Sequence, residues 1–355
     1  GLENRGLGLD ALVAQGFLGA LLRISAYGQR GPAARFASSE LIVQAMGGWV
    51  SSHGLPGRDP CMVGGRLPWY VAGSFAAAAA LSAHEAAVGR GQAVDVDLWV
   101  MECLVGTLAY PMLFNVTLSA LGLPPPDQRY SVLPGIVRCS DGWVGINALT
   151  GQHWEDICSM FDAQEFAGAQ GDLGWGGEAL DRFFARIEPF LAAHTVEETV
   201  ELAQVFRIPA APVATGSTLP ELKQLRARQF YRREPQGRAL RPGPPYRLSA
   251  TPARVDGQAP GLGAHTEAVA SEWTGFPRRS RKALVRAGDV RPFAGLRVID
   301  LSTFWAGPYA TLYLGSLGAD VIKVESTKRP DGFRFSAAFP VEGPDWYERS
   351  GLWQA

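Results

Sequence analysis

The sequence predicts an α/β protein: a large domain with a mostly parallel sheet and flanking helices, plus a smaller α+β domain. Three observations support this fold class. Residues 296–325 predict a strand, a helix and a second strand in that order, residues 70–88 predict an alanine-rich helix, and residues 132–146 predict a hairpin. Two strands joined by a helix form a parallel, right-handed unit. The first observation therefore indicates a Rossmann-like sheet, and the hairpin indicates the smaller domain.

The strand–helix–strand unit also predicts where a ligand binds. Leu296–Leu301 is rich in strand-forming residues, and Ser302–Gly307 interrupts it. Pro308 suits the first turn of a helix, where its missing N–H needs no partner, and Gly318 ends that helix. Ligands of parallel sheets bind beyond the carboxyl ends of the strands, so we expect a site at the turn 302–307. The turn contains one glycine, which excludes the dinucleotide fingerprint and the Walker loop.

Composition narrows the function classes. The chain has 355 residues, enough for two domains, and a net charge of −1, which gives no electrostatic reason to expect nucleic acid or an acidic membrane as partner. The four cysteines lack Cys-x-x-Cys spacing and every histidine is isolated, so we expect no metal site and a cytoplasmic location. The most apolar window, Val71–Ala83, is shorter than the ~20 residues of a bilayer span, so we predict no membrane segment.

Several segments resemble the family III CoA-transferases, the CaiB/BaiF group. The stretch 292–325, with its Ala-Gly-Pro turn and its Leu-Gly-Ala-Asp-Val-Ile-Lys-Val-Glu ending, is similar to the opening of that family. Four further segments are similar to motifs from later in the family pattern: Ile24–Pro32, Ser39–Trp49, Gly89–Trp99 and Arg207–Thr215.

The resemblance implies a division of the chain. We expect the later part of one CoA-transferase module followed by the start of a second, within a fragment of a longer tandem chain. The expected parts are 1–125 for the large domain, 131–230 for the small domain, 231–276 for the return to the large domain, 277–291 for a linker and 292–355 for the start of the second module. We also hypothesise that 292–355 completes the first module's sheet beside the strand at 21–25.

The resemblance implies a chemistry that this sequence only partly supports. The family moves CoA from an acyl-CoA to a carboxylic acid: an aspartate attacks the thioester, and CoA thiolate then attacks the resulting anhydride to give an enzyme thioester. This requires a carboxylate in a water-poor pocket. Alignment on Gly73 and Ala76 places Trp69 at the aspartate position, and no acid lies between Asp59 and Glu85. The first module is therefore predicted to be catalytically silent, with no catalytic residue of its own.

The resemblance also implies a binding surface. The family's turn after its first strand wraps the nucleotide of CoA, and the matching residues are Phe304, Trp305 and Ala306; Ser326 matches a position near the nucleotide after the second strand. A buried core behind the turn is the alternative role for the two aromatic residues. No permanently bound cofactor is expected. Coenzyme A or acyl-CoA would be a substrate, with a small carboxylic acid as the acceptor.

Three functions remain open from the sequence. The first is a CoA-transferase with a degenerate first module, and the second is a non-catalytic CoA-binding or scaffolding subunit. The third is a 2-methylacyl-CoA racemase; its histidine position matches Ser39, just before Glu40, and its aspartate position is again Trp69, so neither residue is present. Because the family forms interlocked dimers, we expect a homodimer or an intramolecular pseudo-dimer.

Overall fold

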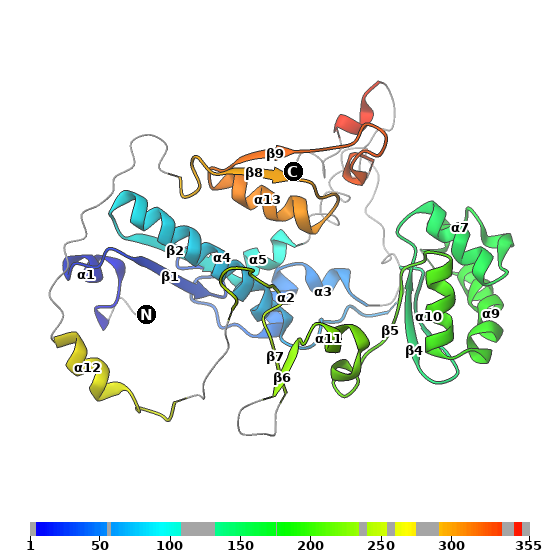
Figure 1. Ribbon diagram of the computed structural model, residues 1–355, viewed down its shortest axis with the longest axis horizontal. Helices are drawn as coiled ribbons and strands as arrows, with labels where there is room; N and C mark the ends of the chain where they lie inside the picture. Colours follow the sequence, from blue (N-terminus) through cyan, green and yellow to red (C-terminus); the bar gives the residue numbers. More distant parts are fainter. Residues whose placement is uncertain are drawn as a thin grey trace. The chain divides into compact units, whose positions relative to one another are not determined.

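The computed structural model describes residues 5–54, 58–107, 132–174, 176–233, 240–253, 260–274, 291–335 and 344–349. The chain divides into two compact units, residues 1–129 with 277–355 and residues 130–276. Each unit contains helices and strands, so the predicted α/β class is confirmed (Figure 1). The expected end of the large domain's first part at residue 125 and all but the last residue of the expected linker 277–291 lie outside the described residues. The predicted domain boundaries remain predictions.

The first unit opens with a small parallel sheet and the helices around it. Its elements are α1 (Leu9–Ala14), β1 (Ala20–Ser25), α2 (Glu40–Met46), α3 (Trp49–Ser52), α4 (Leu67–Arg90), β2 (Val94–Trp99) and α5 (Val100–Gly106). β1 pairs with β2 in parallel, from Ala20 opposite Val94 to Ser25 opposite Trp99. A parallel pair requires a long crossover, and the segment that contains α2, α3 and α4 provides it.

Helix α4 is the alanine-rich helix that the sequence predicts. Ala72 and Ala76 are buried in one core with Leu98 of β2 and Leu104 of α5. Small side chains let a helix approach its neighbours closely, which explains the alanine run. Among the described residues, α4 is the one helix long and apolar enough to cross a membrane by length and composition, a test that core helices of soluble proteins also pass.

The predicted strand–helix–strand unit is present. Its elements are β8 (Arg297–Asp300), α13 (Ala306–Ser316) and β9 (Asp320–Lys323), followed by the short helices η4 (Gly332–Arg334) and η5 (Trp346–Arg349). β8 and β9 are parallel, and Asp300 lies opposite Lys323. The hypothesis that this unit completes the β1 sheet is contradicted, because among the described strands β8 pairs with β9 and β1 pairs with β2 in separate sheets. Side chains of α13 contact α4 and α5 instead: Tyr309 donates a hydrogen bond to Gly106 of α5, and Tyr313 packs against Phe75 of α4.

The second unit is built on an antiparallel sheet. Its elements are β3 (Pro134–Arg138), β4 (Trp143–Asn147), α7 (Gly151–Met160), η2 (Gln164–Phe166), α8 (Gln170–Leu173), α9 (Glu178–Ala193), α10 (Val196–Val205), β5 (Ala210–Pro212), η3 (Leu219–Glu221), α11 (Lys223–Ala227), β6 (Tyr231–Arg233), β7 (Leu240–Pro242) and α12 (Thr266–Thr274). β3 and β4 form the predicted hairpin, and β5 joins β4. Trp154, Ile157 and Phe183 are buried in the core between this sheet and its helices.

Candidate functional site

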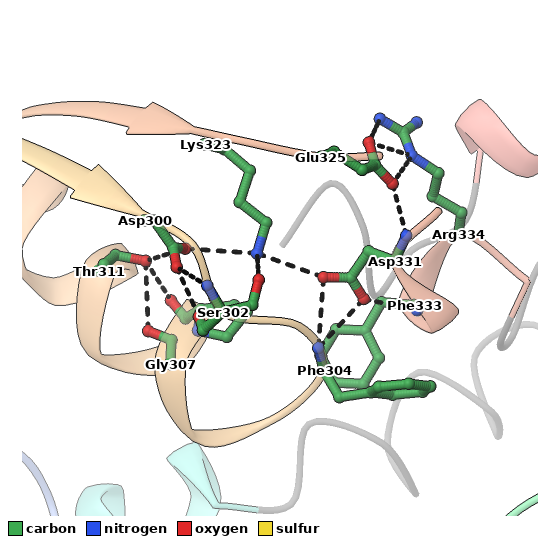
Figure 2. Close-up of polar contacts among 11 residues, drawn as sticks. Asp300, Ser302, Phe304, Gly307, Thr311, Lys323, Glu325, Asp331, Phe333 and Arg334 are labelled. Carbon is green, nitrogen blue, oxygen red and sulfur yellow. Dashed lines mark hydrogen bonds and ion pairs between the residues drawn. The ribbon is translucent and has the colours of Figure 1, made fainter. Parts of the chain in front are cut away.

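Asp300 anchors the candidate turn at the carboxyl end of β8 (Figure 2). Its side chain is only 4% exposed. One carboxylate oxygen accepts hydrogen bonds from the backbone N–H of Ser302 at 2.8 Å and from its hydroxyl at 2.5 Å. The other accepts from the hydroxyl of Thr311 on α13 at 3.0 Å. One buried carboxylate thus ties the start of the turn to the helix that follows it.

Lys323, the last residue of β9, joins that carboxylate to a second one. Its ammonium nitrogen lies 3.3 Å from Asp300 and 3.2 Å from Asp331, and it donates a hydrogen bond of 2.6 Å to the carbonyl of Ser302. Burying a charge is costly unless it is paired and hydrogen-bonded. Here one cation lies between two anions, which offsets that cost and holds the turn against β9.

Asp331 fixes the centre of the turn. It is 1% exposed, and both of its oxygens accept from the backbone N–H of Phe304 at 3.2 Å. Phe304 has a φ of +61°, which is rare for a bulky residue. A Cβ built on Gly332 would lie 1.8 Å from the ring of Phe304, so glycine is required there. Because Asp331 occupies the N–H of Phe304, the ring and the carbonyl are what this residue can offer a ligand.

A second group of charged side chains, Arg334 with Glu325 and Glu348, holds the segment after β9 in place. Arg334 donates to both oxygens of Glu325, at 2.7 Å from Nε and 2.6 Å from a terminal nitrogen, and to Glu348 at 2.5 Å. Glu325 also accepts from the backbone N–H of Asp331 at 2.5 Å. The hydrogen bond from Arg334 is the main cause that lowers the pKa of Glu325, although burial opposes it. The Arg334–Glu325 pair therefore fixes the backbone position of Asp331, because Glu325 accepts its N–H.

The charge state of Asp300 follows from the same contacts. Burial raises its pKa, but the hydrogen bonds from Ser302 and Thr311 and the ammonium of Lys323 outweigh burial and lower the pKa to about 2. The carboxylate is thus ionised at neutral pH, and donors occupy both of its oxygens. A carboxylate whose two oxygens are already hydrogen-bonded stabilises the turn and is a poor nucleophile toward a thioester.

The structure brings three of the predicted binding residues together on this turn. Phe304 is 42% exposed and Trp305 is 52% exposed, and Ala306 begins α13. Phe333 packs edge-on against both rings, with centroid distances of 5.8 and 4.7 Å. These exposed fractions disfavour the alternative of a buried aromatic core. The two rings are presented to solvent on a turn that buried charges hold in place.

Ser326, the fourth predicted binding residue, lies elsewhere on the unit. It is exposed just after β9, and its hydroxyl accepts from the backbone N–H of Lys328 at 3.3 Å. Its backbone bridges to Arg329. Within the described part of the chain Ser326 makes no hydrogen bond to the turn 302–307, so its role as a ligand contact remains a prediction.

Trp69 lies in the first turn of α4, two residues after the helix begins. Its side chain is 38% exposed, and the first turn of α4 contains no acidic residue. Within the residues that the structure describes, no group of three or more His, Cys, Asp or Glu side chains could hold a metal ion.

Sequence reasoning did not single out Lys323, Asp331 and Thr311. The signal for Lys323 was available, because Asp300 and Lys323 end neighbouring parallel strands and the register places them opposite each other. Asp331 lies in a loop, where no periodicity predicts which way a side chain points.

The parallel strand pairs with their crossover helices and the antiparallel sheet with its helices define an α/β protein. The family model of CoA-transferase family III matches residues 20–266 and 293–353. The chain therefore belongs to CoA-transferase family III, as the resemblance indicated.

Three relatives place the chain within this family. It is 25% identical over 326 residues to a probable CoA-transferase of Mycobacterium tuberculosis, with 88% of this chain and 40% of that protein covered. It is 27% identical over 291 residues to the succinyl-CoA–D-citramalate CoA-transferase of Chloroflexus aurantiacus, with 78% and 70% covered. A CaiB/BaiF family protein of Brucella suis has the same fold, with a TM-score of 0.61 at 23% identity and with 76% and 72% covered. The chain thus spans less than half of the mycobacterial relative.

Proposed function

We propose that this chain binds a CoA thioester at the turn 302–307 and acts within a CoA-transferase. The observation that carries the proposal is the pair of exposed rings, Phe304 and Trp305, on a turn fixed by Asp300 and Asp331. Aromatic rings stack on nucleobases, and stacking gains affinity when the ring is held in place beforehand. A small carboxylic acid is the proposed acceptor. A homodimer or intramolecular pseudo-dimer and a cytoplasmic location belong to the same proposal.

We also propose that the segment 20–266 performs no covalent step. Trp69 stands where the family resemblance implies the aspartate, and an indole cannot accept an acyl group. The first turn of α4 supplies no acid that could replace it. Asp300 is saturated with hydrogen bonds and serves the turn. In this proposal the turn 302–307 binds CoA, and the segment 20–266 leaves the chemistry to another carboxylate.

The second candidate function is a non-catalytic CoA-binding subunit, which the tryptophan at position 69 equally favours. A racemase has less support. Its histidine position is Ser39, and the hydroxyl of Ser39 accepts the backbone N–H of Ile42 at 3.4 Å as the cap of α2. That hydroxyl therefore has a structural role, and it cannot move a proton as an imidazole does.

The test is native mass spectrometry of the chain after incubation with succinyl-CoA, the thioester in the name of the Chloroflexus relative. We expect a non-covalent complex and no acyl or CoA adduct. A covalent adduct would overturn the silent assignment of the segment 20–266. The absence of any complex would overturn the binding proposal.

A matched pair of variants locates the site. Trp305→Ala is expected to weaken CoA binding by roughly 5- to 150-fold, since a base stacked on an aromatic ring is worth about 1–3 kcal/mol. Trp143→Ala removes a tryptophan of similar exposure, 48%, from the other unit and is expected to leave affinity unchanged. Equal losses in the two variants would contradict a site at the turn.

A further inference from the structure

We propose that residues 291–335 dock within a single chain onto helices α4 and α5 through one face of α13. Residues 20–107 and 291–335, which come from the two different segments that match the family model, would then belong to one folded unit and not to two separate modules. The contact is argued from protein side chains alone, and only its consequence for the ligand site rests on the proposed function.

The contact consists of three aromatic side chains and one glycine. The hydroxyl of Tyr309 donates to the carbonyl of Gly106, the last residue of α5, at 3.2 Å, and lies 3.0 Å from the hydroxyl of Tyr313. Phe75 of α4 meets both tyrosine rings edge-on, with centroid distances of 6.2 and 5.4 Å. A tyrosine presents an apolar ring and a polar hydroxyl; here both rings pack on Phe75, and the hydroxyl of Tyr309 finds an acceptor. Burial also raises the pKa of Tyr309.

Gly106 permits the close approach. A Cβ built at this position would lie 3.3 Å from the hydroxyl of Tyr309 and 3.6 Å from that of Tyr313. A larger side chain would occupy the space through which Tyr309 reaches the backbone carbonyl. The end of α5 therefore has room for the side chain of Tyr309, which lies 203 positions later in the chain than Gly106.

The two faces of α13 have different tasks. Thr311 donates to Asp300 and so marks the face toward the β8–β9 sheet. Residues advance by about 100° around a helix, so Tyr309 and Tyr313 lie together on a face roughly opposite Thr311. Parallel sheets are stable when helices cover them, and α13 then has one face for its own sheet and one for α4 and α5.

The docking has a consequence for the site. The turn 302–307 leads directly into α13, and Tyr309 in the first turns of this helix contacts Phe75, which is six residues after Trp69 on α4. The ligand turn from one matched segment and the Trp69 end of α4 from the other therefore belong to one unit. The segment 291–335 would provide the nucleotide side of a site whose other residues come from 20–107.

The test is site-specific photo-crosslinking of the full chain. Tyr309→p-benzoylphenylalanine places a photoreactive ring on the docking face, and an equimolar mixture of ¹⁵N-labelled and unlabelled chains separates crosslinks within a chain from those between chains. We expect crosslinked peptides from residues 67–107 of the same chain. Ala310→p-benzoylphenylalanine is the control, because Ala310 is exposed and about 100° away around the helix.

Two results would overturn the proposal: crosslinks found between chains only, or a yield into residues 67–107 no greater than from the Ala310 control. If the position 309 derivative does not fold, Tyr313→p-benzoylphenylalanine asks the same question from a more exposed residue of the same face. A second measurement is the coupling between Phe75→Leu and Tyr313→Leu in unfolding. We expect a roughly 2- to 10-fold departure from additivity, the usual size for an aromatic pair, and an additive result would contradict the contact.

Discussion

Asp331 illustrates how one residue determines the local conformation of the turn. It accepts the N–H of Phe304, which has the unusual φ, and the N–H of Phe333, and it pairs with Lys323. Backbone strain of this kind costs about 1–3 kcal/mol and persists only where the surroundings over-determine it. The carboxylate of Asp331 is the group that satisfies all three neighbours at once.

Asp331→Asn is therefore expected to lower the free energy of unfolding by roughly 1–3 kcal/mol, because an amide leaves one acceptor where a carboxylate had two. Urea unfolding measures the change. Asp320→Asn is the matched control: it breaks the exposed ion pair with Arg297, which an exposed position makes worth at most about 1 kcal/mol. Equal losses of unfolding free energy in the two variants would show that Asp331 contributes no more stability than an exposed ion pair does.

Asp300 predicts a pH dependence. Its pKa in the folded chain is about 2, against an ordinary value of 3.8. A depressed carboxyl pKa contributes stability that is present above about pH 4 and is lost as pH falls toward 2. The shift corresponds to about 2 kcal/mol.

The difference in unfolding free energy between the wild-type chain and Asp300→Asn is thus expected to be largest from pH 5 to 7 and to shrink below pH 4. Urea titrations at stepped pH measure it. A difference that stays constant down to pH 3 would mean that the lowered pKa of Asp300 contributes no stability.

At the scale of elements, glycine and proline made the strand–helix–strand unit predictable. Gly307-Pro308 and Gly318 mark the ends of α13, and the apolar runs on either side have strand propensity. Which strands pair was not predictable, because pairing between distant segments depends on faces that a local pattern does not specify. The order of strand, helix and strand predicted where the turn lies. The position of the Asp331 carboxylate could not be predicted, because it depends on a loop conformation that no sequence periodicity specifies.

Substitution of Gly307 tests how closely the turn 302–307 packs against the start of α13. A Cβ at Gly307 would lie 1.8 Å from the hydroxyl oxygen of Ser302, so Gly307→Ala must displace the residue that Asp300 holds. Gly315→Ala on the same helix places its Cβ 3.5 Å from Val321, an ordinary contact.

Gly307→Ala is expected to destabilise by about 1–3 kcal/mol, as overpacking does, and to weaken CoA binding. Gly315→Ala is expected to be neutral or to stabilise by up to about 1 kcal/mol through helix propensity. Thermal unfolding and CoA titration of both variants provide the comparison. A Gly307→Ala chain that binds and unfolds like Gly315→Ala would show that the turn adjusts freely.

At the scale of the whole molecule, the two units have cores of different kinds. The core of residues 130–276 is rich in aromatic rings, with Trp154 5.0 Å from Phe183 and Phe166 5.4 Å from Phe183 between centroids. The core of the other unit centres on alanines of α4 with Leu98, Val100 and Leu104. Burial of large apolar side chains dominates stability, so the aromatic core is expected to be the more stable of the two.

Separate cores predict separate unfolding transitions, the higher one belonging to residues 130–276. Ile157→Ala and Leu104→Ala each truncate a fully buried residue, one in each unit, at a cost of about 2–5 kcal/mol. Calorimetry should show Ile157→Ala lowering the upper transition alone and Leu104→Ala lowering the lower one alone. Hydrogen exchange of peptides from each unit assigns the transitions. If either substitution moves both transitions together, the units unfold as one, and the stability of the turn 302–307 would then depend on the aromatic core as well as on its own charged contacts.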